Sequence, residues 1–66
     1  MQISLNGQIL DLKAPISLAD LLEEQGYAQR RVAVEVNRSI VPKSRHAQHM
    51  IGEGDKVEIV HALGGG

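Results

Sequence analysis

The sequence contains no cysteine, tryptophan or phenylalanine, and Tyr27 is its single tyrosine. Without cysteine the chain has no disulfide, no thiolate nucleophile and no thiolate metal ligand. Its core must therefore consist of Ile, Leu and Val side chains, each of which contributes about 1.5–3 kcal/mol when fully buried. A chain of 66 residues accommodates one domain of marginal stability, so we expect most of these aliphatic residues to lie inside.

A strong charge bias and a long apolar run are also missing. The formal net charge is -1, unlike the basic composition typical of nucleic-acid-binding domains. No stretch approaches the roughly 20 apolar residues that span a bilayer. Residues 1–4 lack the basic start and apolar stretch of a signal peptide. We therefore expect a cytoplasmic protein with no nucleic-acid partner and no membrane partner.

The N-terminal segment predicts a β-hairpin. Apolar and polar side chains alternate over residues 1–5, as in a half-buried strand. The dipeptide Asn6-Gly7 follows, and it is typical of a type I′ turn, in which both central residues have positive φ. Residues 8–12 return as a second strand, with Leu10 facing the core and Ile9 facing the other side.

A short helix is predicted to begin at Ser17. Its hydroxyl can cap the backbone N–H of Asp20, which occupies the acidic position of a capping box. Gly26 is placed to end the helix. A helix of about two turns is unstable alone, so its apolar stripe must pack on a sheet. That stripe consists of Leu18, Leu21 and Leu22.

The remaining sequence predicts three more strands. Alternation over residues 32–36 indicates one strand, and residues 40–41 form a short one at an edge, because Pro42 cannot donate to a ladder. Residues 43–50 are polar and irregular, with one turn of helix. Residues 56–62 form the last strand, centrally placed beside the first. The predicted fold class is α+β: a small mixed sheet of four to five strands with one helix across one face.

The chain ends in His61-Ala62-Leu63-Gly64-Gly65-Gly66. Consecutive glycines cannot pack, and glycine loses more conformational freedom on ordering than any other residue. We expect residues 1–62 to form the folded domain and residues 63–66 a flexible tail. When extended, residues 62–66 reach roughly 16–18 Å, at about 3.3–3.6 Å per residue. The tail can therefore enter a deep site on another protein, and the α-carboxylate of Gly66 is the predicted working group.

Several motifs follow one another along the chain. They are Asn6-Gly7, Ser17-x-x-Asp20-Leu21-Leu22, Val32-Ala33-Val34-x-Val36-Asn37, Ile40-Val41-Pro42-Lys43, Gly54-Asp55-x-Val57 and the terminal glycines. In this order they resemble the ThiS family of sulfur carriers in thiamine biosynthesis, over essentially the whole chain. The resemblance implies a β-grasp (ubiquitin-like) fold.

The resemblance also implies a carrier that is not an enzyme. In this family an E1-like adenylyltransferase (ThiF type) uses ATP to adenylate the terminal carboxylate, which becomes a thiocarboxylate. The sulfur comes from cysteine, usually by way of a cysteine desulfurase, and thiazole synthase (ThiG type) takes it to build the thiazole ring. By this match Gly65 and Gly66 are the functional pair and Gly64 lengthens the tail. No bound cofactor and no metal are implied.

A carrier also needs a surface that its partners recognise. Such surfaces usually combine a few apolar anchors with a charged rim. The predicted anchors are Val41, Val60 and Leu63. The predicted rim charges are Arg38, Lys43 and Arg45. The alternative for the anchors is that they are ordinary exposed aliphatic side chains, which are common on protein surfaces.

Other functions stay open at this point. A carrier of the MoaD type would use the same chemistry for molybdopterin, and a ubiquitin-like modifier would be linked through Gly66 to lysines of other proteins. A β-grasp interaction module with an inert tail is a further alternative. His46 and His49 are spaced to share a helix face, but a zinc site needs a third ligand that the sequence does not indicate. Arg30-Arg31 fits a solvated basic edge better than a nucleic-acid site.

Overall fold

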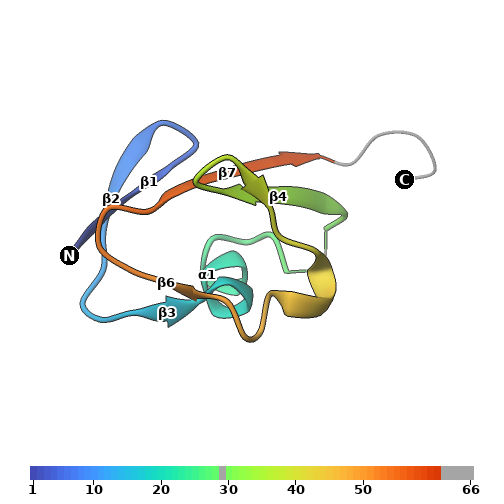
Figure 1. Cartoon of the computed structure of the whole chain (residues 1–66), viewed down its shortest axis with the longest axis horizontal. Coiled ribbons are helices and arrows are strands. Elements are labelled where there is room, and N and C mark those ends of the chain that lie inside the picture. The colour runs from blue at the N-terminus through green and yellow to red at the C-terminus, as the bar shows by residue number, and fades with distance from the viewer. Residues whose placement is uncertain (29, 62–66) are drawn as a thin grey trace.

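The computed structural model describes residues 1–28 and 30–61, the side chain of His61 excepted. The described part contains one α-helix, which lies against a five-stranded sheet (Figure 1). The elements are β1 (Gln2–Leu5), β2 (Gln8–Asp11), β3 (Ile16–Ser17), α1 (Leu18–Glu24), β4 (Val32–Val36), β5 (Ser39–Ile40), η1 (Lys43–Arg45), β6 (Met50–Ile51) and β7 (Lys56–His61). The strand order is β2-β1-β7-β4-β5, and β3 and β6 form a separate two-stranded sheet.

The predicted hairpin is confirmed. Asn6 and Gly7 have φ angles of 50° and 84°, as a type I′ turn requires. The antiparallel register of β1 and β2 pairs Ile3 with Leu10, and both side chains pack in or against the core. Ile9 is 66% exposed. Strand alternation therefore assigned both faces of the hairpin correctly.

The last strand is central, as predicted. β7 is parallel to β1, with Leu5 opposite Val57, and antiparallel to β4, with Val34 opposite Ile59. It therefore lies between β1 and β4 (Figure 1), paired with β1 at Lys56 and Val57 and with β4 from Val57 to His61. Val57 and Ile59, the two residues predicted to face inward, are buried.

The helix begins where the sequence predicted. Ser17 caps it, and the Ser17 hydroxyl accepts from the backbone N–H of Asp20 at 3.1 Å. The three leucines of the stripe are buried. Gly26 follows the helix with φ of 87°, a conformation that favours glycine. These leucines pack with apolar side chains of the sheet to form the core, which consists of Ile3, Leu18, Leu21, Leu22, Val34, Val36, Val41, Ile51, Val57 and Ile59.

The segment after Pro42 is more ordered than predicted. The predicted turn of helix forms as a 3-10 turn at Lys43–Arg45, but Met50–Ile51 then pairs with Ile16–Ser17, which was not predicted. The carbonyls of His46 and His49 accept from the N–H groups of Ala19 and Leu18 at 2.9 and 2.8 Å. These N–H groups lie in the first turn of α1 and have no partner within the helix. The segment is therefore held by the helix N-terminus, which local sequence patterns did not indicate.

β5 is an edge strand, as Pro42 predicted, but it spans Ser39–Ile40 and ends one residue before Val41. Within the described ranges, no helix is long and apolar enough to cross a membrane.

Candidate functional site

The strand that leads to the tail, β7, is paired with its neighbour β4 as far as its last described residue. The ladder between β4 and β7 runs from Val36 opposite Val57 to Val32 opposite His61. β1 pairs with the other edge of β7 at Lys56 and Val57. Residues 62–66 therefore follow a strand whose backbone is held by the sheet.

Asn6 adds two hydrogen bonds between the hairpin and β7. The last residue pair of β1 and β7 is Leu5 with Val57. Beyond it, the Asn6 side-chain Oδ1 accepts from the N–H of Ile59 at 2.7 Å, and the Asn6 N–H donates to the carbonyl of Val57 at 2.9 Å. The asparagine that forms the turn thus also anchors β7 two residues before its end.

The predicted tail residues lie outside the described residues. These are Leu63, Gly64, Gly65 and Gly66, and the predicted domain boundary at residue 62 lies there too. The roles assigned to them stay predictions. What the structure does describe is the strand from which they continue.

One predicted anchor, Val60, lies on the exposed outer face of the sheet. Val60 is 60% exposed, and its cross-strand neighbour is Ala33. Ile40 on β5 is 66% exposed and pairs with Glu35, which in turn faces Glu58. We call this surface the outer-face patch; it consists of Ala33, Glu35, Ile40, Glu58 and Val60.

The prediction of Val41 as a surface anchor is wrong. Val41 is 7% exposed and belongs to the core. Its N–H donates to the carbonyl of Val34 at 2.9 Å, which holds it beside β4 with its side chain inside. Ile40 takes the exposed position instead, because successive side chains alternate between the two faces. Strand alternation indicates that Ile40 and Val41 face opposite sides, but it does not indicate which of the two is buried.

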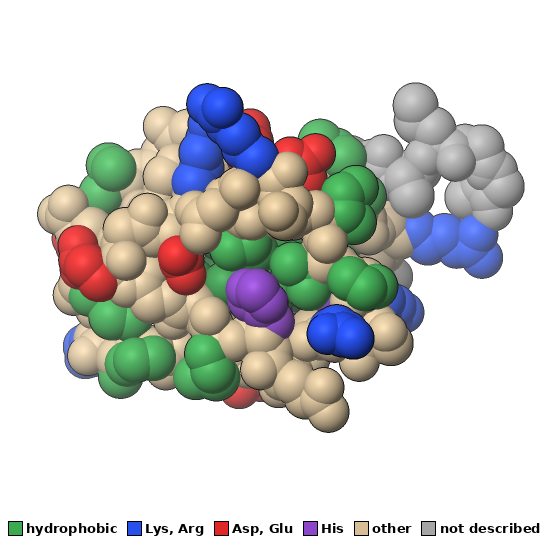
Figure 2. Space-filling view, viewed as in Figure 1, with side chains coloured by type: hydrophobic (Ala, Val, Ile, Leu, Met, Phe, Trp, Pro, Cys, Tyr) green, Lys and Arg blue, Asp and Glu red, His purple; other side chains and the backbone are tan. Residues whose placement is uncertain are grey.

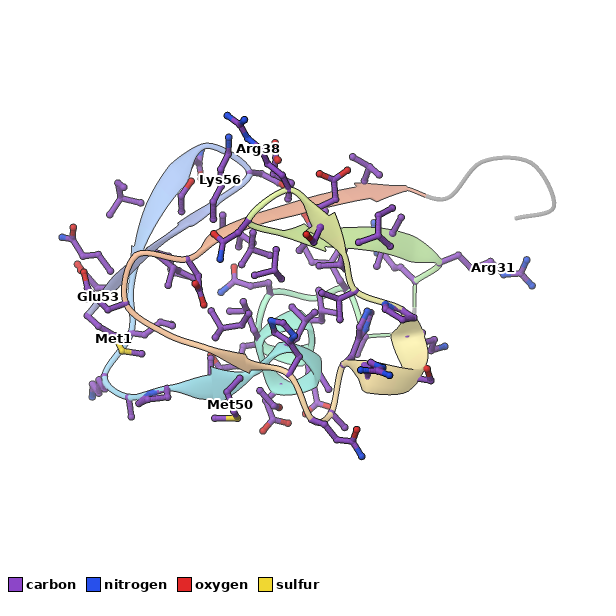
Figure 3. The ribbon with its side chains drawn as sticks, in the orientation of Figure 1. Met1, Arg31, Arg38, Met50, Glu53 and Lys56 are labelled. Atoms are coloured by element: carbon purple, nitrogen blue, oxygen red, sulfur yellow. The ribbon has the colours of Figure 1, made fainter. Side chains whose placement is uncertain are left out.

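The predicted rim charges do not form one surface. Arg38 follows β4 beside the start of β7, and Figure 3 shows it close to Lys56, far from the end of β7. Lys43 and Arg45 are exposed on η1, near the other end. Arg31 points away from the body at that end (Figure 3). The cations therefore separate into a group at the start of β7 and a group around η1.

A pocket of about 500 Å³ lies between α1, η1 and the start of β4. Val32, one of its lining residues, is the cross-strand partner of His61. The pocket therefore opens at the end of the molecule where β7 ends. Figure 2 shows Lys and Arg side chains at this end. Local sequence patterns did not indicate this pocket, since its walls come from three separate segments.

The two histidines of the zinc alternative have different surroundings. His46 is 7% exposed, and its Nε2 lies 2.9 Å from the carbonyl oxygen of Val41. A carbonyl can only accept, so Nε2 carries a hydrogen and donates it. Across residues 1–28 and 30–61, no group of three His, Asp or Glu side chains is arranged to hold a metal ion.

Comparison with known proteins gives the family. The family model described as the ThiS family matches residues 3–66. The chain belongs to the ThiS family. The sulfur carrier protein ThiS of Escherichia coli is 33% identical over 66 residues, which cover all of both chains. This match supports the prediction of a carrier rather than an enzyme.

A solved structure of the same family confirms the predicted β-grasp fold. The crystal structure of the thiamine biosynthesis protein ThiS from Geobacter metallireducens superimposes with a TM-score of 0.87. The two chains are 26% identical, and the alignment covers all of both. The ThiS resemblance drawn from the motifs is therefore confirmed by sequence and by structure.

Two larger relatives contain a segment similar to this ThiS-family chain. The thiazole synthase of Paramagnetospirillum magneticum is 46% identical over 66 residues, and that of Magnetococcus marinus is 38% identical over the same length. The chain spans 20% of the length of each of these relatives. In both, a ThiS-like segment and the remainder of a thiazole synthase belong to one polypeptide.

Proposed function

We propose that this ThiS-family chain carries sulfur as a thiocarboxylate on Gly66 and donates it for the thiazole ring of thiamine. The observation that carries the proposal is the full-length match to a sulfur carrier. The geometry of β7 supports it, since this strand is paired with β4 as far as His61 and residues 62–66 continue from its end. A strand held in the sheet, followed by a glycine-rich end, suits a terminal carboxylate that other enzymes must reach.

The chemistry follows from the terminal group. A C-terminal carboxyl group is ionised at neutral pH, and a carboxylate is a poor electrophile. Transfer of AMP from ATP supplies a leaving group, so that a sulfur nucleophile can attack the acyl carbon. Gly65 and Gly66 have no side chains to obstruct the nucleotide or the nucleophile. In this proposal the chain supplies the reacting group, and the partner enzymes supply ATP and catalysis.

The proposed partners are an E1-like adenylyltransferase of the ThiF type, a sulfur donor such as a cysteine desulfurase, and thiazole synthase of the ThiG type. The thiazole synthases that contain a similar segment support the last of these. We propose a cytoplasmic setting with no nucleic-acid or membrane partner. The carrier binds no cofactor; its sulfur is held covalently.

The outer-face patch is the proposed docking surface for the adenylyltransferase. It combines exposed apolar side chains, Val60 and Ile40, with the carboxylates of Glu35 and Glu58. This matches the usual composition of an apolar anchor with a polar surround. Val60 also lies on the strand that leads to the tail, so docking there would direct residues 62–66 toward the partner's active site.

Intact mass tests the proposal directly. The chain is incubated with a ThiF-type enzyme, ATP and a sulfur source, and we expect its mass to rise by the difference between one sulfur and one oxygen atom. A reaction without ATP is the control. An unchanged mass with an enzyme that adenylates its own verified carrier contradicts the proposal. The proposal requires a free carboxyl group at Gly66, which the intact mass of the native cellular protein reports.

The names of the relatives favour thiamine over molybdopterin as the destination of the sulfur. A thiocarboxylated chain should therefore copurify with thiazole synthase and not with the large subunit of molybdopterin synthase. Attachment through Gly66 to lysines of other proteins would instead identify a modifier. A complex that survives deletion of the tail would identify an interaction module.

A further inference from the structure

The pocket beside η1 has the construction of a small-molecule site. Its volume of about 500 Å³ lies within the range of roughly 300–1,000 Å³ that is typical of ligand pockets. Most of its lining is apolar, and these side chains come from α1, the loop that follows α1, β4 and the segment after η1. They are Ala19, Leu22, Tyr27, Ala28, Val32 and Ala47.

Backbone hydrogen bonds fix the walls of the pocket. The Tyr27 N–H donates to the carbonyl of Leu22 at 2.8 Å, and the Arg30 N–H donates to the carbonyl of Tyr27 at 3.0 Å. On the opposite wall, the His46 ring is held by the carbonyl of Val41, and the His46 carbonyl accepts from α1. Tyr27, at the start of the loop after α1, and His46, after η1, are therefore both hydrogen-bonded to α1.

The charged side chains of the lining are mostly cationic. Arg30, Arg31 and Lys43 line the pocket together with one acid, Glu23. The side chains of Arg30 and Lys43 are exposed, and both line the pocket, Arg30 from the loop after α1 and Lys43 from η1. Guanidinium and ammonium groups bind phosphate and carboxylate through charge-assisted hydrogen bonds. A pocket whose lining combines apolar side chains with such cations suits a ligand with an apolar body and an anionic group.

We propose that this pocket binds a small organic anion, a phosphate or carboxylate attached to an apolar body. The body lies against the apolar lining, and the anionic group is held between Arg30 and Lys43. This site shares no residue with the outer-face patch, and it does not depend on the proposed function. Since Val32 lines the pocket and faces His61 across the ladder, a bound anion would lie close to the end of β7. An enzyme that encloses the tail would then contact the bound anion.

Titration of the full 66-residue chain followed by ¹⁵N–¹H correlation spectra tests this. The probes are phenyl phosphate, benzoate and inorganic phosphate. We expect saturable shifts at the amides of Tyr27, Ala28, Val32 and Ala47. Phenyl phosphate should bind about tenfold more tightly than inorganic phosphate, because the ring is removed from water. Comparison of phenyl phosphate with benzoate assigns the preference to phosphate or to carboxylate.

Matched variants locate the binding. Arg30→Gln should weaken phenyl phosphate binding by about five- to tenfold. Arg45→Gln is the control. Arg45 is exposed and lies on η1 like Lys43, but it does not line the pocket. Ala47→Phe should remove binding by filling the pocket, while unchanged β7 amide shifts show that the fold is retained.

Three results would overturn the proposal. The first is the absence of saturable shifts at roughly 10 mM phenyl phosphate, which corresponds to negligible affinity. The second is inorganic phosphate binding as tightly as phenyl phosphate, which would show that the apolar lining contributes nothing. The third is equal weakening by Arg30→Gln and Arg45→Gln, which would show non-specific attraction to a basic surface.

Discussion

The side-chain amide of Asn37 donates to the carboxylate of Asp55 across 3.0 Å. The Asn37 Oδ1 also accepts from the N–H of Lys56 at 2.9 Å, and the other Asp55 oxygen accepts from the N–H of Gly52 at 2.9 Å. The turn after β4 is therefore joined to the first residue of β7. Both residues belong to the motifs on which the family resemblance rests, and this contact gives a structural reason for them.

Asn37→Ala should lower the free energy of unfolding by about 2–5 kcal/mol. The variant loses two hydrogen bonds, at about 0.5–1.5 kcal/mol each, and places alanine at φ of 52°, which costs about 1–2 kcal/mol. Asn37→Gly is the matched control, since it loses the same bonds without the backbone penalty. Urea unfolding measures both. Equal stability of the two variants and the unmodified chain would contradict this role.

Asn6→Gly should loosen β7 near the tail. Glycine keeps the positive φ of the turn but removes the oxygen that accepts from Ile59 at 2.7 Å. A loss of about 1 kcal/mol in local stability corresponds to roughly fivefold faster amide hydrogen exchange at Ile59. The amides of α1 are the internal reference. Unchanged exchange at Ile59 would show that the turn does not anchor the strand.

His46→Leu should destabilise the fold by about 1–3 kcal/mol, because it leaves the Val41 carbonyl without the donor that now lies 2.9 Å away. His49→Leu is the control. The contact of His49 with α1 uses its backbone carbonyl, so this change should stay within about 0.5 kcal/mol. Thermal unfolding compares the two. Equal effects would mean that the His46 ring has no special structural role.

Val41→Ala and Val60→Ala should separate stability from recognition. Val41 is in the core, and its truncation should cost about 1–3 kcal/mol of unfolding free energy. Val60→Ala should change stability by less than about 0.5 kcal/mol, yet weaken binding to the adenylyltransferase by roughly fivefold. Chemical denaturation and calorimetric titration measure the two quantities. Unaltered binding of Val60→Ala would remove the outer-face patch as the docking surface.

Changes in the tail should affect only the transfer of sulfur. Gly65→Val or deletion of Gly66 should reduce thiocarboxylate formation by roughly 100-fold, since small misplacements of a reacting group have effects of this size. The melting temperature should not move. Mass spectrometry and thermal unfolding provide the two readouts. Normal sulfur loading in a folded Gly66-deleted chain would exclude the tail mechanism.

Local patterns predicted most of the secondary structure because they depend on neighbours in the chain. The positive φ of Asn6-Gly7, the cap at Ser17 and the burial of the three helical leucines were all confirmed. The ordered segment from Lys43 to Ile51 was not predicted in full. It is held by α1 and β3, which lie more than twenty residues earlier in the chain, and no local pattern shows such partners.

The amino-acid sequence by itself determined the fold class, the family and the glycine-rich end, since these depend on composition, periodicity and the order of motifs. Only the tertiary structure decided that Val41 is buried while Ile40 is exposed. It also decided that the His46 ring donates to the Val41 carbonyl. Arg30 and Lys43 line one pocket for the same reason. The physical reason is that surfaces and pockets are formed by residues far apart in sequence. Their neighbours are chosen by the packing of the whole core.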